Sequence, residues 1–278
     1  MQKPTIAIIG PGRAGSALAR AASSAGYTLA AIGGRNPGNV SSLATELGAR
    51  ACQTPATTID LADLTILAVP DDVILPLATD MADSLCSSAG KAAVHLSGAQ
   101  DRGALQPLAK LGSLRIGVFH PLQTFRRGPQ AVQNVAGTYF GIDADEPLHT
   151  QLQQLAVDLQ GHPFDLAGID RALYHAAAVF AANYSMTLLA EAIALATDAG
   201  LDEATARPGM TTLLAGAVNN LRELAPADAV TGPAARGDEG TIAKHLAALS
   251  RDPAAQRLYQ LLADRTKLLV RKNKEEAA

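Results

Sequence analysis

Apolar runs alternate with amphipathic stretches over the first 166 residues of the chain. Thr5–Ile9 is short and rich in β-branched residues, as a buried strand is, and Ala14, Leu18, Ala21 and Ala25 then recur at helical spacing. Further strands are predicted at 28–32, within 63–72 and 91–99, and at 114–121, 137–143 and 162–166, with helical stretches such as 147–159 between them. Because strands and helices alternate, the sequence predicts an α/β Rossmann fold, a doubly wound and mainly parallel sheet with helices on both faces.

The pattern changes near residue 167, beyond which we find no convincing strand. Residues 170–200 form one long helical stretch closed by Gly200, and more helices follow, separated by breaks at 207–209 and 230–240. We therefore expect a Rossmann domain over 1–167 and an all-helical domain over 168–278 that caps the cofactor edge of the sheet. The helix over 171–199 is apolar nearly all round, so we also expect the helical domain to form a homodimer.

Three glycines follow the first predicted strand and spell G-x-G-x-x-G at Gly10, Gly12 and Gly15. The first glycine allows a tight turn, the second lets a pyrophosphate approach the backbone, and the third lets the helix pack closely. The new helix begins at Arg13 and Ala14 with unpaired N–H groups and a partial positive charge. Any glycine-rich turn can produce such a motif, but the strand before it and the helix after it favour a dinucleotide-binding loop.

The end of the second predicted strand indicates which dinucleotide is bound. An NAD-binding unit places an acid about 20 residues past the glycines, where it holds the ribose 2′-hydroxyl. This chain has Arg35 and Asn36 there, and an arginine can clamp a 2′-phosphate instead. We therefore predict NADP(H) as the cofactor, with added charge from Arg13; the alternative is that Arg35 is a solvated loop residue. The backbone of Val69 and Pro70 is expected to pass beside the nicotinamide ribose, before Asp71 and Asp72 cap the next helix.

Polar residues at two later strand ends are candidates for the chemistry. His120 ends an apolar strand and precedes a proline, and a histidine can deliver a proton near neutral pH while the cofactor delivers a hydride. Ser97 ends the run VHLSG and can donate a hydrogen bond to a substrate carbonyl. The alternatives are a structural histidine and a turn-forming serine.

The long helix adds Tyr174, His175 and Asn183 near its start, which should face the cleft. His175 is the rival proton donor, and Asn183 can line the same pocket, although buried polar caps would give the same pattern. Arg236, in the run TGPAARGD, is a candidate clamp for a substrate carboxylate, and Asp238 is expected to cap the following helix.

The composition of the chain argues against several classes of binding partner. The formal net charge is −3 and the basic residues are scattered, which argues against a nucleic-acid partner. The two cysteines, Cys52 and Cys86, have no metal-ligand spacing, so we expect no metal and a reducing cytoplasm. We also expect no membrane segment and no signal peptide, because no run of about 18 apolar residues is evident and the first strand begins at once.

Five motifs together carry a family resemblance: GPGRAG, LSGA, HPLQTF, DRALYHAAAVFAAN and TGPAARGD, in this order over residues 5 to 250. The chain resembles Rossmann-like proteins with a DUF2520 C-terminal part, which are described as candidate NADP-dependent oxidoreductases. Their architecture is similar to that of 6-phosphogluconate dehydrogenase, pyrroline-5-carboxylate reductase and ketopantoate reductase. The resemblance implies a helical domain like the C-terminal domain of 6-phosphogluconate dehydrogenase, and some relatives are thought to reduce ketopantoate.

Comparison with related enzyme families bears on the mechanism. Ser97 and His120 resemble the serine and the histidine of the HP motif in prephenate dehydrogenases. Hydroxyacid dehydrogenases and ketopantoate reductases instead place a lysine four residues before the asparagine, where this chain has Val179 before Asn183. We therefore expect a reductase of a small, carboxylate-bearing carbonyl or imino acid, with ketopantoate-like 2-oxo acids included. Two alternatives stay open: an NADPH-binding sensor without turnover, and a reductase that uses deazaflavin F420 beside NADP.

Overall fold

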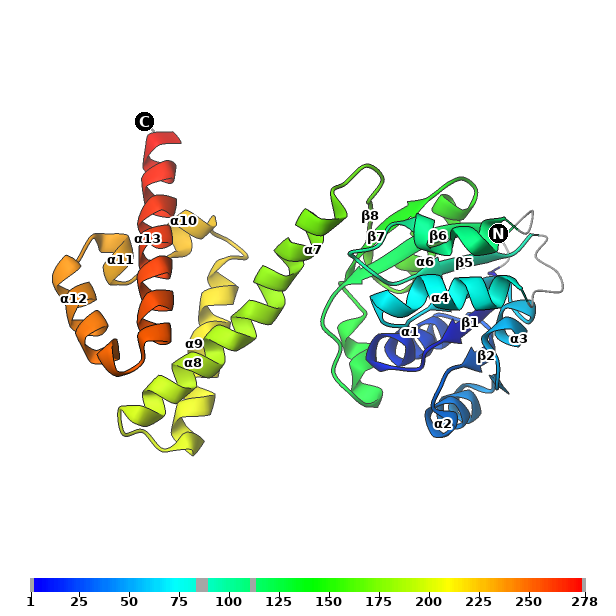
Figure 1. Ribbon diagram of the computed structural model, residues 1–278, viewed down its shortest axis with the longest axis horizontal. Coiled ribbons are helices and arrows are strands. Elements are labelled where there is room, and N and C mark those ends of the chain that lie inside the picture. Colours follow the sequence, from blue (N-terminus) through cyan, green and yellow to red (C-terminus); the bar gives the residue numbers. More distant parts are fainter. Residues whose placement is uncertain (1–2, 84–89, 111–113, 277–278) are drawn as a thin grey trace. The chain divides into compact units, whose positions relative to one another are not determined.

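The computed structural model describes residues 3–83, 90–110 and 114–276, and it divides into two compact units, Met1–Phe180 and Ala181–Ala278 (Figure 1). The first unit contains the sheet and the second is helical. Sequence patterns place the domain boundary at 167/168, shortly after the last strand, whereas the first compact unit also includes the helix α7 (Arg171–Val179). Cys86 lies outside the described residues.

The sheet of the first unit has eight strands in the order β3-β2-β1-β4-β5-β6-β7-β8. The strands are β1 (Ile6–Ile9), β2 (Leu29–Gly33), β3 (Arg50–Cys52), β4 (Leu64–Leu67), β5 (Ala92–His95), β6 (Arg115–Leu122), β7 (Tyr139–Ala144) and β8 (His162–Asp165). Neighbouring strands are parallel except β6 and β7, which are antiparallel. The sequence does not predict β3, since it has three residues and only Cys52 is buried.

Helices cover both faces of this sheet. The helices of the first unit before α7 are α1 (Arg13–Ser24), α2 (Pro37–Leu47), α3 (Pro55–Asp60), α4 (Asp71–Ala82), α5 (Gln106–Ala109) and α6 (Leu148–Asp158), with 3-10 turns η1 (Arg102–Leu105) and η2 (Pro129–Asn134). Ile8 belongs to a core cluster with residues of α1, α2 and α6, while its neighbour Ile9 belongs to another cluster with residues of α3, α4 and α5. Successive residues of a strand point to opposite faces, so the sheet is doubly wound as predicted.

The single helix predicted over 170–200 has three parts. After α7 comes a π-helical turn, η3 (Phe180–Tyr184), and then α8 (Ser185–Asp198). The rest of the second unit consists of α9 (Glu203–Asn220), α10 (Pro226–Ala229), α11 (Pro233–Arg236), α12 (Glu239–Ala248), the 3-10 turn η4 (Leu249–Arg251) and α13 (Pro253–Glu276). No strand follows Asp165 in the described part of the chain, which confirms the change from α/β to all-helical structure.

One helical stretch departs from the expected absence of membrane-spanning segments. Arg171–Asp198 is long and apolar enough to cross a bilayer by length and composition, and none of its most apolar window is buried. Length and composition alone are weak evidence, because a helix that packs against other protein passes the same criterion. Its apolar surface is also what a helix-packed protein interface requires.

Candidate active site

The glycine-rich turn after β1 forms an open cradle at the N-terminus of α1. Gly10 has φ +96°, and a Cβ there would lie 2.4 Å from the carbonyl oxygen of Ala68. A Cβ on Gly15 would lie 2.2 Å from the carbonyl oxygen of Gly10, so both glycines serve close packing. A Cβ on Gly12 would meet nothing within 4 Å, and Gly12 is the N-cap of α1 without a side-chain cap. Backbone N–H groups of the first turn therefore stand ready for a phosphate.

Alanine substitutions should separate the two kinds of glycine. Gly12→Ala is expected to change the free energy of unfolding by less than about 0.5 kcal/mol but to weaken dinucleotide binding, because its Cβ projects into open space where the ligand would lie. Gly10→Ala is expected to destabilise the fold by about 1–3 kcal/mol or more, since its Cβ meets backbone and its φ is left-handed. Urea unfolding and titration with NADPH measure the two effects. Equal losses of stability in the two variants would contradict the open cradle.

The end of β2 carries the predicted arginine and a helix cap. Arg35 is exposed. Asn36 is the N-cap of α2, and its Oδ1 accepts a hydrogen bond of 3.0 Å from the backbone N–H of Asn39. Arg35 thus stays available for a phosphate, while the structure gives Asn36 a structural role that the sequence analysis did not assign to it.

After β4, the chain passes Val69 and Pro70 and enters α4. Pro70 is the N-cap, without a side-chain cap, and Asp71 and Asp72 lie in the first turn. The expectation that these aspartates cap the helix is therefore wrong in detail. Their carboxylates stabilise the helix through its dipole instead, and the charge of Asp71 makes a small contribution that opposes the lowering of the His120 pKa by burial.

Ser97 follows β5 and holds a turn. Its Oγ accepts hydrogen bonds from the backbone N–H groups of Ala99 (3.1 Å) and Gln100 (3.0 Å). The preceding His95 is fully buried, with Nε2 2.9 Å from the carbonyl oxygen of Asp101 and Nδ1 accepting from the N–H of Ser97. The turn is thus fixed from both sides. Ser97 retains its hydroxyl hydrogen as a donor, and its role toward a substrate carbonyl stays a prediction.

His120 lies in the last part of β6, two residues before the strand ends, and against the turn after β5. A Cβ built on Gly98 would lie 2.8 Å from both Cε1 and Nε2 of the His120 ring, so the absence of a side chain at residue 98 makes room for the imidazole. Nδ1 of His120 lies 2.8 Å from the carbonyl oxygen of Leu96. A carbonyl oxygen only accepts, so Nδ1 carries the hydrogen, and Nε2 of the neutral ring presents a lone pair.

His120 and three side chains of α7 near its ring each have a buried polar atom without a hydrogen-bond partner. These atoms are Nε2 of His120, the hydroxyl of Tyr174, Nδ1 of His175 and Nη1 of Arg171. The ring of Tyr174 meets the His120 ring edge-on, with centroids 5.6 Å apart, and also lies 6.3 Å from the ring of Phe164. Buried polar groups are ordinarily paired, so an unsatisfied cluster of this kind is typical of a ligand site.

Burial sets the protonation states in this cluster. It lowers the pKa of His120, and the charges of His175 and Arg171 lower it further against the opposing effect of the Leu96 carbonyl. Burial raises the pKa of Tyr174 to about 12. At neutral pH the imidazole is therefore uncharged and the phenol is protonated.

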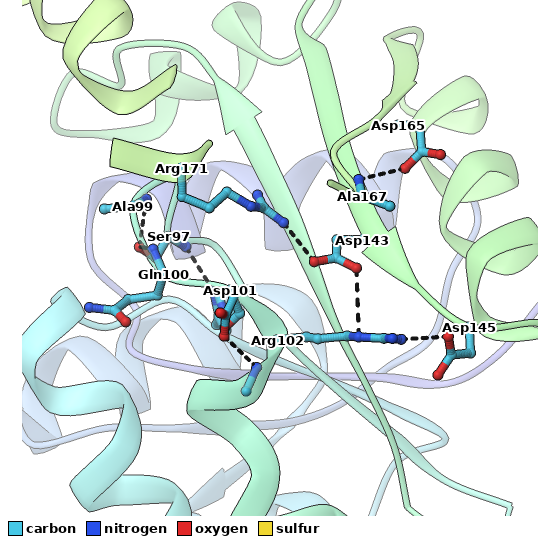
Figure 2. Close-up of polar contacts among 12 residues, drawn as sticks. Ser97, Ala99, Gln100, Asp101, Arg102, Asp143, Asp145, Asp165, Ala167 and Arg171 are labelled. Carbon is cyan, nitrogen blue, oxygen red and sulfur yellow. Dashed lines mark hydrogen bonds and ion pairs between the residues drawn. The ribbon is translucent and has the colours of Figure 1, made fainter. Parts of the chain in front are cut away.

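Arg171, the first residue of α7, is anchored by carboxylates of the sheet. Its Nη2 donates to Oδ2 of Asp143 at 2.7 Å, and its side chain is 10% exposed. Figure 2 shows that Asp143 also pairs with Arg102 (3.7 Å), and that Arg102 in turn pairs with Asp145 (2.6 Å). Arg102, Asp143 and Arg171 line a cavity of about 1070 Å³ on the unit. The pairing fixes the guanidinium and leaves Nη1 for another acceptor.

The remaining predicted substrate residues belong to the second unit. Asn183 lies in the π-helical turn and is exposed, and π-helical turns are frequent at functional sites. Arg236 ends α11 and is also exposed. Asp238 caps α12 through the N–H of Thr241, as expected. Substrate binding by Asn183 and Arg236 stays a prediction.

Three residues at these sites have no role that the sequence alone indicates. Tyr174 and Arg171 have unpartnered buried atoms near His120, and Arg127 lines a cavity beside Gly12. A buried phenol or guanidinium on a helix gives no pattern of its own in a sequence. Among the described residues, no group of three or more His, Cys, Asp or Glu is placed to hold a metal ion.

Comparison with known families and structures agrees with this architecture. Residues 2–121 match a Rossmann-like domain, and residues 138–266 match DUF2520, a domain of unknown function. A comparison with curated proteins finds no match. A Bacteroides fragilis structure described as a candidate NADP oxidoreductase has 27% identity and a TM-score of 0.79, with 95% of this chain and 98% of that chain covered.

More distant structures share the fold. A Plasmodium falciparum pyrroline carboxylate reductase with NADP bound has 14% identity and a TM-score of 0.64, over 97% of this chain and 99% of that one. An Aspergillus terreus reductive aminase in complex with NADPH and ethyl levulinate has 18% identity and a TM-score of 0.63, over 99% of this chain and 95% of that one.

Proposed function

Because the chain joins a Rossmann-like domain to a DUF2520 domain, we propose that it is an NADP(H)-dependent oxidoreductase that reduces a small, carboxylate-bearing carbonyl or imino acid. The observation that carries the proposal is the cluster of unpartnered buried polar atoms on His120, Tyr174, His175 and Arg171. The names of the similar structures, which include an NADP oxidoreductase, a pyrroline carboxylate reductase and a reductive aminase, support the class of reaction. A reducing cytoplasm is the compartment we expect.

The residues present fit an NADP(H) cofactor. Gly12 leaves room for a pyrophosphate at the N-terminus of α1, and Arg35 is exposed at the end of β2. The reduced cofactor would supply the hydride that reaches the substrate carbon. Ser97 follows β5, and His120 lies in the last part of the neighbouring parallel strand β6, so both lie toward the carboxyl edge of these strands, where ligands bind in open α/β folds.

Within this proposal, the protein supplies the proton that must reach the substrate heteroatom. His120 delivers it from Nε2 in its charged form, while the carbonyl of Leu96 holds the ring in place through Nδ1. In the oxidative direction the bare Nε2 of the neutral ring accepts the same proton. Ser97 orients the carbonyl group.

A turnover assay with a panel of 2-oxo acids and cyclic imino acids tests the proposed function. Loss of NADPH absorbance that depends on one of these substrates is expected. Tight binding of NADPH with no turnover across the panel would favour the second candidate, an NADPH sensor. That candidate rests on Val179, which stands four residues before Asn183 where related dehydrogenases have a catalytic lysine.

A homodimer through the helical unit is part of the proposal. No residue of α8 is buried, and Leu213 of α9 is 68% exposed, so these helices present apolar surface. We expect an isologous helix-packed dimer, the commonest arrangement of identical subunits. Light scattering at micromolar concentration should give twice the chain mass, and a particle of 28.6 kDa would contradict the dimer.

A further inference from the structure

A cavity of about 470 Å³ lies beside the glycine-rich turn and is positively charged. Its wall combines the start of α1, the middle of α2 and a loop that follows β6. It is lined by Pro11, Gly12, Arg13, Ser16, Arg20, Asn39, Ser42, Leu43, Arg127 and Gly128. The lining contains three arginines and no carboxylate, so the cavity suits an anion.

The three arginines are not equivalent. Arg20 is held by Glu46 through two hydrogen bonds of 2.6 and 2.7 Å, so its charge is compensated. In the described part of the chain, Arg13 and Arg127 have neither an ion pair nor a hydrogen-bond partner for their side chains, and both are exposed. The uncompensated positive charge of the cavity therefore comes from Arg13 and Arg127.

The fold holds Arg127 close to α1. Gly128 has φ +94° and is the N-cap of η2, and a left-handed residue of this kind favours glycine. Ala131 of η2 is buried in one core cluster with Ala17 and Leu18 of α1, and the two elements pack together. The amide of Asn134 also donates to the carbonyl oxygen of Thr124 at 3.0 Å, which ties the loop before Arg127 to η2.

The position of the cavity in the fold indicates which phosphate group of a dinucleotide it would bind. The pyrophosphate belongs at Gly12 and the N–H groups of α1, whereas the adenosine ribose belongs beside the end of β2 and the start of α2. Gly12 lines this cavity on the pyrophosphate side, and Asn39 and Ser42 of α2 line it on the ribose side. We propose that Arg127, together with Arg13, binds the 2′-phosphate of NADP(H) and shares with Arg35 the discrimination against NAD(H). The proposal rests on the proposed function for the identity of the cofactor.

Calorimetric titration of the full-length protein with adenosine 2′,5′-bisphosphate, AMP, NADPH and NADH tests the assignment. Arg127→Ala is expected to weaken binding of the bisphosphate and of NADPH by about 10-fold, because a partly solvated charge-assisted contact to phosphate is lost. Binding of AMP and NADH should stay within about 2-fold, since neither carries a 2′-phosphate. The double variant Arg35→Ala/Arg127→Ala should lose most of the preference for NADPH over NADH, and Arg13 should account for the remainder.

Arg126→Ala is the matched control. Arg126 is the neighbouring arginine of the same loop, but its Nη2 donates to Oε1 of Gln133 at 2.9 Å and it does not line the cavity. This variant should bind all four ligands as the unmutated protein does.

Each contrary result has its own meaning. Unchanged NADPH affinity in Arg127→Ala, with the unmutated protein still preferring NADPH, overturns the assignment of Arg127 and leaves the proposed function standing. Equal weakening of NADPH and NADH assigns Arg127 to the pyrophosphate and also overturns the proposal. Failure of the unmutated protein to bind either dinucleotide overturns the proposed function itself.

Discussion

Replacing His120 with asparagine is expected to lower reductive turnover by about 10²- to 10⁴-fold and to leave NADPH affinity unchanged. The variant removes the ring nitrogen Nε2, which is buried without a partner, while the asparagine amide can still donate to the carbonyl of Leu96. Turnover is measured with the best substrate of the panel, and NADPH affinity by titration. Wild-type turnover in this variant would remove His120 from the mechanism.

The pH dependence of the same reaction follows from the lowered pKa of His120. Reduction requires the protonated ring, and its pKa lies below the ordinary value of 6.5. The reductive rate should therefore be highest in acid and fall as the pH rises through this lowered pKa. The oxidative rate should rise over the same range, because the neutral ring accepts the proton.

Variants of the neighbouring residues show which side chain is the proton donor. The phenol of Tyr174 has a pKa of about 12 and therefore stays protonated over the whole working range of pH. A reductive rate that does not change from acid to alkaline pH, together with loss of activity in Tyr174→Phe, would identify this phenol as the proton donor. His175→Asn is the control for the second histidine. Ser97→Ala should cost less, about 1–3 kcal/mol in the transition state, since it removes one hydrogen bond.

NADPH should bind more tightly than NADH by roughly 10- to 150-fold, since charge-assisted contacts to a phosphate contribute about 1.5–3 kcal/mol. Arg35 stands where an NAD-binding unit has an acid, and it is exposed to any ligand at the end of β2. Arg35→Ala should remove most of this preference for NADPH and leave the affinity for NADH nearly unchanged. Equal dissociation constants of the two dinucleotides for the unmutated protein would contradict the prediction.

The sequence by itself determined the architecture, because periodicity and glycine placement are local properties. Buried parallel strands are mostly apolar, and their alternation with helical patterns is enough to specify a doubly wound sheet. Gly10 and Gly15 must be glycines because a side chain at either position would meet the backbone of a neighbouring element, so the motif that they form can be recognised in the sequence. His120 was predicted as a site residue for a similar reason, since a polar residue near the end of an apolar strand lies toward the edge where ligands bind, and this assignment stays a prediction.

Tertiary structure alone decided the direction of β7 and what each side chain at the site can do. Strand pairing is a long-range property, and the apolar run of β7 does not show that it pairs antiparallel with β6. The tautomer and the lowered pKa of His120 depend on the Leu96 carbonyl and on burial beneath α7 residues, which are distant in sequence. Arg127 lies more than 100 residues after the glycine-rich turn, yet the packing of η2 on α1 brings it to the same cavity. Hydrogen bonding, desolvation and charge act through space, so these properties exist only once the chain has folded.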